Sequence, residues 1–312
     1  TYMYDHNTPR LQLTLPHVAY LKISDGCDNR CAYCSIPNIR GRMRSRSIAS
    51  VVKEAENLLA GGVQEILLIA QDITAFGSDN KDPKENFAEL LRQLDNLGGD
   101  YFLRMLYTHP AHFTDEAIEV MGKCKHLLPY IDVPLQHIND KILKRMGRKV
   151  TKKQICTLLE KLRKAVPGIA IRTTFITGLP GETETEFEEL VEFVKEQRFE
   201  RLGVFAFSPE PGTPAADMPD AVDREVAEDR SDYIMELQEK ISLESNLELV
   251  GSEIKVIVDW IENNAAVGRT FADAPEIDNS VNIIDGGKLR PGTIVTGKVT
   301  GATEYELEVC VK

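Results

Sequence analysis

The sequence lacks any apolar run close to the roughly eighteen residues that a membrane-spanning helix needs. It also has few cysteines, six in 312 residues at scattered positions, which argues against the disulfide framework of a small secreted domain. No signal peptide precedes the first strand-like run. Together these absences predict a soluble protein of the reducing cytoplasm, with no membrane partner.

Basic residues are in the minority, since 37 Lys and Arg stand against 49 Asp and Glu, a formal net charge of −12 at pH 7. An excess of acid makes broad nucleic-acid binding unlikely, because phosphate backbones are bound by Lys and Arg. The same charge suits a basic protein partner. The chain also begins at Thr1 without an initiator methionine, so we expect a fragment or a processed form.

Short apolar runs alternate with amphipathic segments over the first two thirds of the sequence, as in a parallel sheet covered by helices. Strands are predicted at 17–24, 65–71, 101–108, 130–135, 169–177 and 201–208. Helices are predicted at 47–60, 85–97, 113–123, 139–165 and 183–197. Six β/α units predict an α/β fold, a partial (β/α)6 barrel that binds ligands at the C-terminal ends of its strands.

The texture of the sequence changes after a turn-rich connector at 208–219 and a long charged helix from about 221 to 246. From Ser252 onward, short β runs between Gly-rich turns predict a five-stranded antiparallel barrel of the oligonucleotide-fold type. The expected organisation is therefore an N-terminal remnant or linker at 1–14, an α/β domain at 15–219, a linking helix at 220–248 and a small all-β domain at 249–312.

Three cysteines, Cys27, Cys31 and Cys34, follow the first predicted strand directly. Their spacing brings the sulfurs onto one face of a loop, where they can share an ion or a cluster. A structural zinc site would need a fourth Cys or His nearby, and the other three cysteines are isolated. A four-iron four-sulfur cluster on three thiolates leaves one iron open to a ligand that is not protein, and we favour this interpretation.

The loop CDNRCAYC (27–34), on the first strand of a six-unit barrel, resembles the radical S-adenosylmethionine superfamily. The resemblance implies that S-adenosyl-L-methionine occupies the open iron of one [4Fe-4S] cluster through its amino and carboxylate groups. Reductive cleavage of the sulfonium would then yield a 5′-deoxyadenosyl radical. The cofactor performs the difficult step, so no catalytic side chain is assigned, and the protein supplies binding and a dry cavity.

The resemblance extends from about Leu15 to Val311 and narrows to the methylthiotransferases, whose terminal barrel is called a TRAM domain. It is carried by the runs GVQEILLIAQDITAFG (62–77), YIDVPLQH (130–137), RTTFITGLPGETETEF (172–187) and RLGVFAFSPEPGTPAA (201–216). One branch modifies an adenosine next to the tRNA anticodon, and another modifies the β-carbon of an aspartate in small-subunit ribosomal protein S-twelve. AQDITAFG (70–77) and FSPEPGTPAA (207–216) resemble the ribosomal branch.

The charge of the terminal domain favours the same branch. Residues 249–312 contain ten Asp and Glu against six Lys and Arg, which suits a basic ribosomal protein better than a phosphate backbone. The tRNA-modifying branch remains the first alternative. The second is a non-catalytic module that docks on the ribosome and has a merely structural metal loop. An electron donor such as flavodoxin is also expected for the enzyme.

Full-length members of this family carry an N-terminal domain with three further cysteines for a second cluster, which is implicated in sulfur delivery. Nothing in this sequence corresponds to that domain. We therefore expect this chain to bind one cluster and to cleave S-adenosylmethionine, but not to complete sulfur insertion alone.

Six residues beside the cysteine loop or at strand ends are candidates for cofactor binding: Tyr33, Gln71, Gln136, Arg172, Gly178 and Ser208. Gln71 ends the second strand and either contacts a ligand or forms a turn. Arg172 lies inside an apolar strand and needs a carboxylate, either that of methionine or a neighbouring Asp or Glu. Gly178 suits close approach of a ribose or carboxylate, although it also fits a turn before a helix cap.

Other conspicuous residues have simpler interpretations. His137 is expected only to line the site. The basic stretch 40–46 is either a solvated surface or a binding site for the target aspartate or ribosomal RNA. Trp260 is expected to pack in the small barrel. The isolated cysteines Cys124, Cys156 and Cys310 are expected to be structural.

The cysteine count gives the first testable prediction. Anaerobic reconstitution should load about four iron atoms per chain, because only one three-cysteine loop is present. Iron analysis of the purified, reconstituted protein measures this directly. About eight iron atoms per chain would contradict it.

Overall fold

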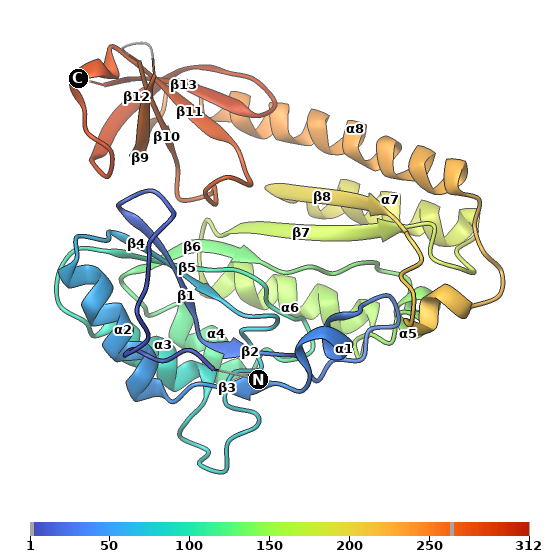
Figure 1. The fold of residues 1–312 in the computed structure, drawn as a ribbon. Helices are drawn as coiled ribbons and strands as arrows, with labels where there is room; N and C mark the ends of the chain where they lie inside the picture. Colours follow the sequence, from blue (N-terminus) through green and yellow to red (C-terminus); the bar gives the residue numbers. More distant parts are fainter. Residues whose placement is uncertain (1–2, 263–264, 312) are drawn as a thin grey trace.

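The computed structural model describes residues 3–262 and 265–311. It shows an α/β unit and a small β-barrel joined by a long helix (Figure 1). The α/β unit is built on an open six-stranded parallel sheet of order β1-β4-β5-β6-β7-β8. Its strands are β1 Val18–Lys22, β4 Glu65–Ile69, β5 Phe102–Met105, β6 Leu127–Asp132, β7 Ala170–Thr177 and β8 Arg201–Ala206. The predicted partial barrel is confirmed.

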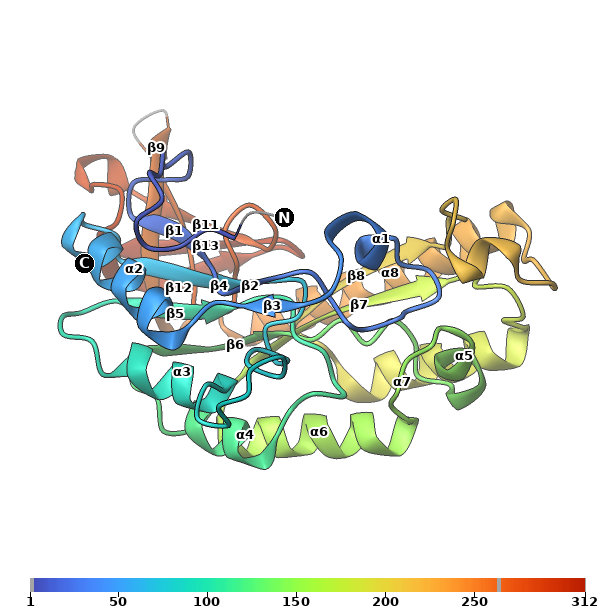
Figure 2. The same ribbon diagram turned by 60° about the horizontal axis from the view of Figure 1, so that its bottom comes forward.

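Helices cover the outer face of this sheet, as Figure 2 shows most clearly. They are α2 Ile48–Ala60, α3 Phe87–Asp95, α4 Asp115–Met121, α6 Lys152–Ala165 and α7 Glu184–Gln197. Polar N-caps fix where several of them begin: Ser47, Asn86 and Thr114 each accept a hydrogen bond from a backbone N–H in the first turn. Their apolar faces and the outward-facing strand residues form one continuous core.

The helix predicted at 139–165 is wrong, because the chain forms two helices there. A short α5, Asp140–Arg145, ends before Gly147, whose φ of +70° cannot continue a right-handed helix. A Cβ at this glycine would lie 2.7 Å from the carbonyl oxygen of Arg30, so the segment also passes too close to the cysteine loop for a side chain. Thr151 then caps α6 through a capping box.

Short elements surround the cysteine loop at the C-terminal edge of the sheet. The loop lies between β2 Ser24–Asp25 and α1 Ile36–Arg40, and β2 pairs with β3 Arg44–Ser45. The 3-10 helix η1, Pro214–Asp217, lies in the connector after β8. From there the long helix α8, Arg224–Glu248, runs beside β7 and β8 to the small barrel (Figure 1). Among the described residues, every helix is too short or too polar to cross a membrane.

The small domain is a closed five-stranded barrel of order β10-β11-β13-β12-β9, as predicted. Its elements are β9 Glu253–Glu262, β10 Ala265–Arg269, β11 Ser280–Ile284, η2 Gly286–Lys288, β12 Ile294–Ala302 and β13 Glu306–Val311. Two details differ from expectation. The pair β11–β13 is parallel rather than antiparallel. Trp260 is 42% exposed instead of packed in the core, and the register between β9 and β10 shifts between Trp260 and the buried Val258.

A buried ionic cluster joins the two domains at the N-terminal ends of the sheet strands. Glu65, at the start of β4, accepts hydrogen bonds from Arg104 Nε at 2.6 Å and from Arg269 Nη2 of the small barrel at 2.8 Å. Arg269 also pairs with Asp259, which contacts His17 Nε2 at 3.0 Å. All five side chains are nearly inaccessible to solvent. These charges therefore hold the domains in one relative orientation.

The charge of Glu65 gives a prediction about domain docking. Burial alone would raise its pKa, but Arg104 and Arg269 lower it to about 2. A group with a lowered folded pKa stabilises the protein above its unfolded pKa, near 4.5, and loses that contribution as pH falls toward 2. Glu65→Gln should lower the free energy of unfolding by about 3–5 kcal/mol at neutral pH, since it leaves buried guanidinium groups short of a partner.

Urea unfolding measured between pH 7 and pH 3 checks this, and the variant should lose less stability than wild type on acidification. Glu119→Gln is the control, because the Glu119–Lys123 pair on α4 is exposed and its loss should not be measurable. Equal stability of wild type and Glu65→Gln at pH 7 would contradict the role of this cluster.

Candidate functional site

The loop that carries the three cysteines lies at the C-terminal edge of the sheet. Cys27, Cys31 and Cys34 are free thiols of intermediate exposure. The loop begins at Gly26, with φ of +81°, where a Cβ would lie 2.3 Å from the carbonyl oxygen of Arg42. Only glycine lets the chain pass so close to the returning strand β3. Backbone hydrogen bonds from Cys27 N to Gly41 O and from Cys34 N to Cys31 O fold the loop on itself.

Contacts from three other parts of the chain hold the loop in place. The backbone of Ala32 donates to Met146 O and accepts from Ala215 N, each at 2.8 Å. At the end of β4, Gln71 Oε1 accepts from Gly26 N at 2.8 Å. Gln71 thus holds Gly26, the first residue of the loop, in position. Its side chain contacts the protein itself, so Gln71 neither merely forms a turn nor faces only a ligand.

The thiols share one electrostatic environment. Burial raises the pKa of Cys27 and of Cys34, and the neighbouring Cys31 raises both further. The Arg148 charge opposes the shift at Cys34. The thiols of Cys27 and Cys34 are therefore protonated at neutral pH, so binding of a metal or cluster at these two residues must displace protons.

The donor set of this loop fits a cluster better than a zinc ion. Among the described residues, the group of His, Cys, Asp and Glu side chains close enough to share an ion consists of Asp72, His109 and His112, and it contains none of the three cysteines. The three sulfurs are therefore not gathered within 4.8 Å of one another, and no His, Asp or Glu side chain that the structure describes joins them in a site for a single ion such as zinc. Three thiolates without a fourth protein ligand fit an iron-sulfur cluster with one open position, which stays a prediction.

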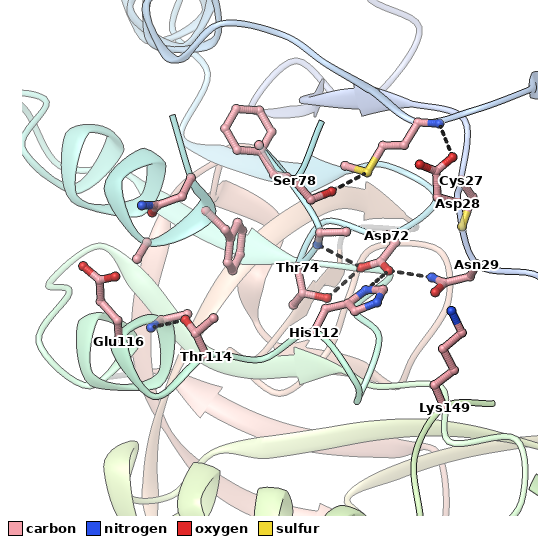
Figure 3. Close-up of a pocket in the computed structure, with 18 residues that line it drawn as sticks. Cys27, Asp28, Asn29, Asp72, Thr74, Ser78, His112, Thr114, Glu116 and Lys149 are labelled. Atoms are coloured by element: carbon pink, nitrogen blue, oxygen red, sulfur yellow. Dashed lines mark hydrogen bonds and ion pairs between the residues drawn. The ribbon is translucent and has the colours of Figure 1, made fainter. Parts of the chain in front are cut away.

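Asp72, which follows β4 and which the sequence places at the ligand-binding edge of the sheet, is the centre of a hydrogen-bond network beside the cysteine loop (Figure 3). Its carboxylate is buried and accepts from Asn29 Nδ2 of the cysteine loop at 2.8 Å. It also accepts from Thr74 Oγ1 at 2.6 Å and lies 2.7 Å from His112 Nδ1. The network borders a pocket of about 480 Å³ that Cys27 also lines. The position of Asp72 directly after the second predicted strand is the sequence feature that indicates its place at the site.

His109 adds a buried imidazole beside this network. It stacks on His112, and burial lowers its pKa to about 3, so it is neutral at physiological pH. Its Nδ1 accepts from Ala111 N, which leaves the proton on Nε2. That Nε2 is buried and has no hydrogen-bond partner among the described residues.

Tyr33, Gln136 and Ser208 all lie near the C-terminal edge. Tyr33 packs on an apolar cluster that includes Met146 and Leu179, and burial raises its pKa. Gln136 has a φ of +71°, unusual for a residue with a side chain, and its backbone bridges to Phe175 of β7. Ser208 is exposed and lines a separate hollow of about 470 Å³ near the start of α8.

Arg172 and Gly178 both have close partners within the protein. Arg172 pairs with Asp132 at 2.9 Å and with Asp278 of the small domain at 3.2 Å, so the ion pair with neighbouring carboxylates is the alternative that the structure shows. At Gly178 a Cβ would lie 2.2 Å from Ala227 Cβ of α8. Close packing of α8 thus explains this glycine. A cofactor contact at either residue stays a prediction.

The structure also bears on three further expectations from the sequence. His137 is fully buried, with Nε2 3.5 Å from Glu182, so it does not line the site. The basic stretch is not simply solvated, because Arg46 is buried against Glu54 while Arg42 pairs with Asp28 at the surface. Cys310 is exposed, whereas Cys124 and Cys156 pack against the core.

Comparison with known proteins agrees with the fold and the loop. Residues 21–194 match the model of the radical SAM superfamily, and residues 250–311 match that of the TRAM domain. Among solved structures, coproporphyrinogen III oxidase (HemN) from Escherichia coli, a radical SAM enzyme, has a TM-score of 0.55 at 15% identity, over 83% of this chain and 65% of that one. The methyltransferase TsrM from Kitasatospora setae has a TM-score of 0.53 at 21% identity, over 64% and 36%. The fold and the three-cysteine loop are those of a radical S-adenosylmethionine enzyme.

Curated relatives narrow the class. A ribosomal protein uS12 methylthiotransferase RimO from Akkermansia muciniphila is 47% identical over 98% of this chain and 69% of its own length. Another, from Desulforamulus reducens, is 45% identical, also over 98% of this chain and 69% of its own length. This chain belongs to the radical SAM methylthiotransferases, in the family of the ribosomal protein uS12 methylthiotransferases RimO.

The Asp72 network predicts how firmly the loop is held. Asp72→Asn should speed release of iron from the reconstituted protein to a chelator by about tenfold, because residues that orient the ligand loop typically contribute 10–100-fold to metal affinity. Asp95→Asn is the control, since Asp95 bonds His126 far from the loop. Equal release rates for Asp72→Asn and wild type would contradict the network's role.

Proposed function

We propose that this chain attaches a methylthio group to the β-carbon of an aspartate in small-subunit ribosomal protein S-twelve (uS12). The observation that carries the proposal is the three-cysteine loop at the C-terminal edge of the sheet, in a chain whose curated relatives are named for this reaction. Cys27, Cys31 and Cys34 are the proposed ligands of one [4Fe-4S] cluster. S-adenosyl-L-methionine is the proposed ligand of its open iron.

When bound, the cluster and S-adenosylmethionine supply the radical that removes a hydrogen atom from the target carbon. The chain's own residues position this chemistry. Gln71 and Asp72 hold the two ends of the segment Gly26–Asn29 through hydrogen bonds of 2.8 Å. The apolar contacts around Tyr33 exclude water from one side of the loop. Gln136 and Ser208 remain proposed cofactor contacts.

The substrate and the reductant follow from charge and chemistry. The net charge of −12 supports a basic protein substrate over a nucleic acid, and the small domain is itself acidic. A small reducing protein such as flavodoxin is the proposed electron donor. A cluster on free thiols needs a reducing compartment, which supports action in the cytoplasm.

The reconstituted chain should make 5′-deoxyadenosine from S-adenosylmethionine when dithionite is added. Cys31→Ala should abolish this product and the brown cluster absorption while leaving the far-ultraviolet circular dichroism unchanged, because the thiol is lost and the fold is not. Cys156→Ala is the matched control, since this thiol packs against the core away from the loop.

Two results bear on the alternatives. A wild-type chain with no cluster absorption and no 5′-deoxyadenosine would contradict the proposed enzymatic function and favour a non-catalytic binding module. In a deletion strain, loss of the methylthio mass from uS12 supports the proposal. Loss from tRNA with unchanged uS12 would instead assign the chain to tRNA modification.

A further inference from the structure

The helices α7 and α8 enclose a groove of about 650 Å³ between them. Its lining residues come from α7, over 184–195, and from the first part of α8, over 226–233. α7 begins after the C-terminal end of β7, and α8 begins after the short connector 218–223 that follows η1 (Figure 1). Because Ala215 of η1 donates to the cysteine loop, one end of the groove lies at the same edge of the sheet as that loop.

The floor of the groove is apolar. Phe187 and Val191 of α7 are one helical turn apart and share a face. Val226 and Tyr233 of α8 are two turns apart and also share a face, and the Tyr233 ring lies edge-on to the Phe187 ring at 6.1 Å between centroids. Val226 is 39% exposed and Tyr233 is 51% exposed, so this strip is open to water. An apolar strip between two helices suits the apolar face of a further segment.

The rim of the groove is acidic. It carries four carboxylates and two cations: Glu184, Glu188, Glu192 and Asp229, with Lys195 and Arg230. Lys195 pairs with Glu192, and Arg230 pairs with Glu184. Within the described part of the chain, Glu188 of α7 and Asp229 of α8 form no ion pair. Neither residue lies in the first turn of its helix, so the helix dipole does not account for them. The groove therefore presents negative charge that the protein does not neutralise.

Apolar surface and free carboxylates together select the occupant. Nucleic acid does not fit, because the carboxylates repel its phosphates. A second copy of this chain is also disfavoured, because each copy has a net charge of −12. A basic protein segment with apolar side chains on one face complements both the strip and the rim.

We propose that the α7–α8 groove docks a basic amphipathic segment of the protein substrate, uS12. This inference rests on the proposed function, because it takes uS12 to be the substrate. Lys or Arg side chains of the segment pair with Glu188 and Asp229, and its apolar side chains cover Val226 and Tyr233. Since one end of the groove lies at the edge of the sheet that carries the cysteine loop, a substrate anchored there keeps the rest of its chain near the loop.

Binding of purified uS12 to the wild-type chain and to variants, measured by biolayer interferometry at two salt concentrations, tests the proposal. The double variant Glu188→Lys/Asp229→Lys should bind about tenfold more weakly, because like charges then face each other. Tyr233→Ser should bind about fivefold more weakly at both salt concentrations, because it removes an apolar contact that salt does not screen.

Glu160→Lys/Glu196→Lys is the matched control. It makes the same change in net charge at two exposed carboxylates outside the groove, so it should leave the affinity for uS12 nearly unchanged. Equal affinity of the groove double variant and the wild type would overturn the inference. An equal loss in both double variants would overturn it as well, because binding would then depend on overall charge alone.

Photo-crosslinking gives a second readout that needs only one substitution at an exposed position. Benzoylphenylalanine in place of Val226 should crosslink to uS12, and mass spectrometry of the linked peptide should identify a segment rich in Lys and Arg. The same probe in place of Glu160 should give no crosslink. A crosslink from position 226 to a second copy of the chain, or to ribosomal RNA, would contradict the inference. The methylthio mass of uS12 in a deletion strain reports separately on the proposed function, so the two can fail independently.

Discussion

The site depends on the backbone of Ala32, in the middle of the cysteine loop. Its N–H donates to the carbonyl oxygen of Met146, after α5, and its C=O accepts from the backbone N–H of Ala215, in η1. These two partners are far apart in sequence and belong to the connections that follow β6 and β8. The loop therefore has its position only when the sheet has closed far enough to bring both connections together. The folded barrel therefore fixes the loop that carries the three thiols.

Charge is distributed unevenly along the strands of the sheet. At their N-terminal ends, Glu65, Asp259 and Asp278 neutralise the buried arginines that dock the small domain. At the C-terminal edge, the Asp72 carboxylate is hydrogen-bonded to Asn29 and lies beside His112. There, Arg148 Nη1 lies 3.9 Å from Cys31 Sγ. The same residue type thus has a purely structural role at one end of the sheet and faces the thiols at the other.

Much of the fold could be predicted from the sequence, because local periodicity indicates each strand and most of the helices. The cysteine loop was equally visible, since its spacing is local. What the sequence did not reveal depended on contacts between distant segments. Nothing near Arg172 in the sequence reveals that Asp278 reaches it from the other domain, and nothing near Gly178 reveals Ala227. Gly147 was the visible exception: a glycine within a helical pattern signals a break.

The position of the small barrel constrains what can be bound. It docks on residues that begin the strands, such as Glu65 and Arg201, whereas the cysteine loop follows the strand ends. Strands of five to eight residues span about 17–26 Å, so the two regions lie roughly that far apart. The buried ion pairs fix this separation. A small molecule cannot touch both regions, whereas a macromolecule can place one part against the barrel and present a single residue at the loop. The docked geometry therefore suits a large substrate modified at one position.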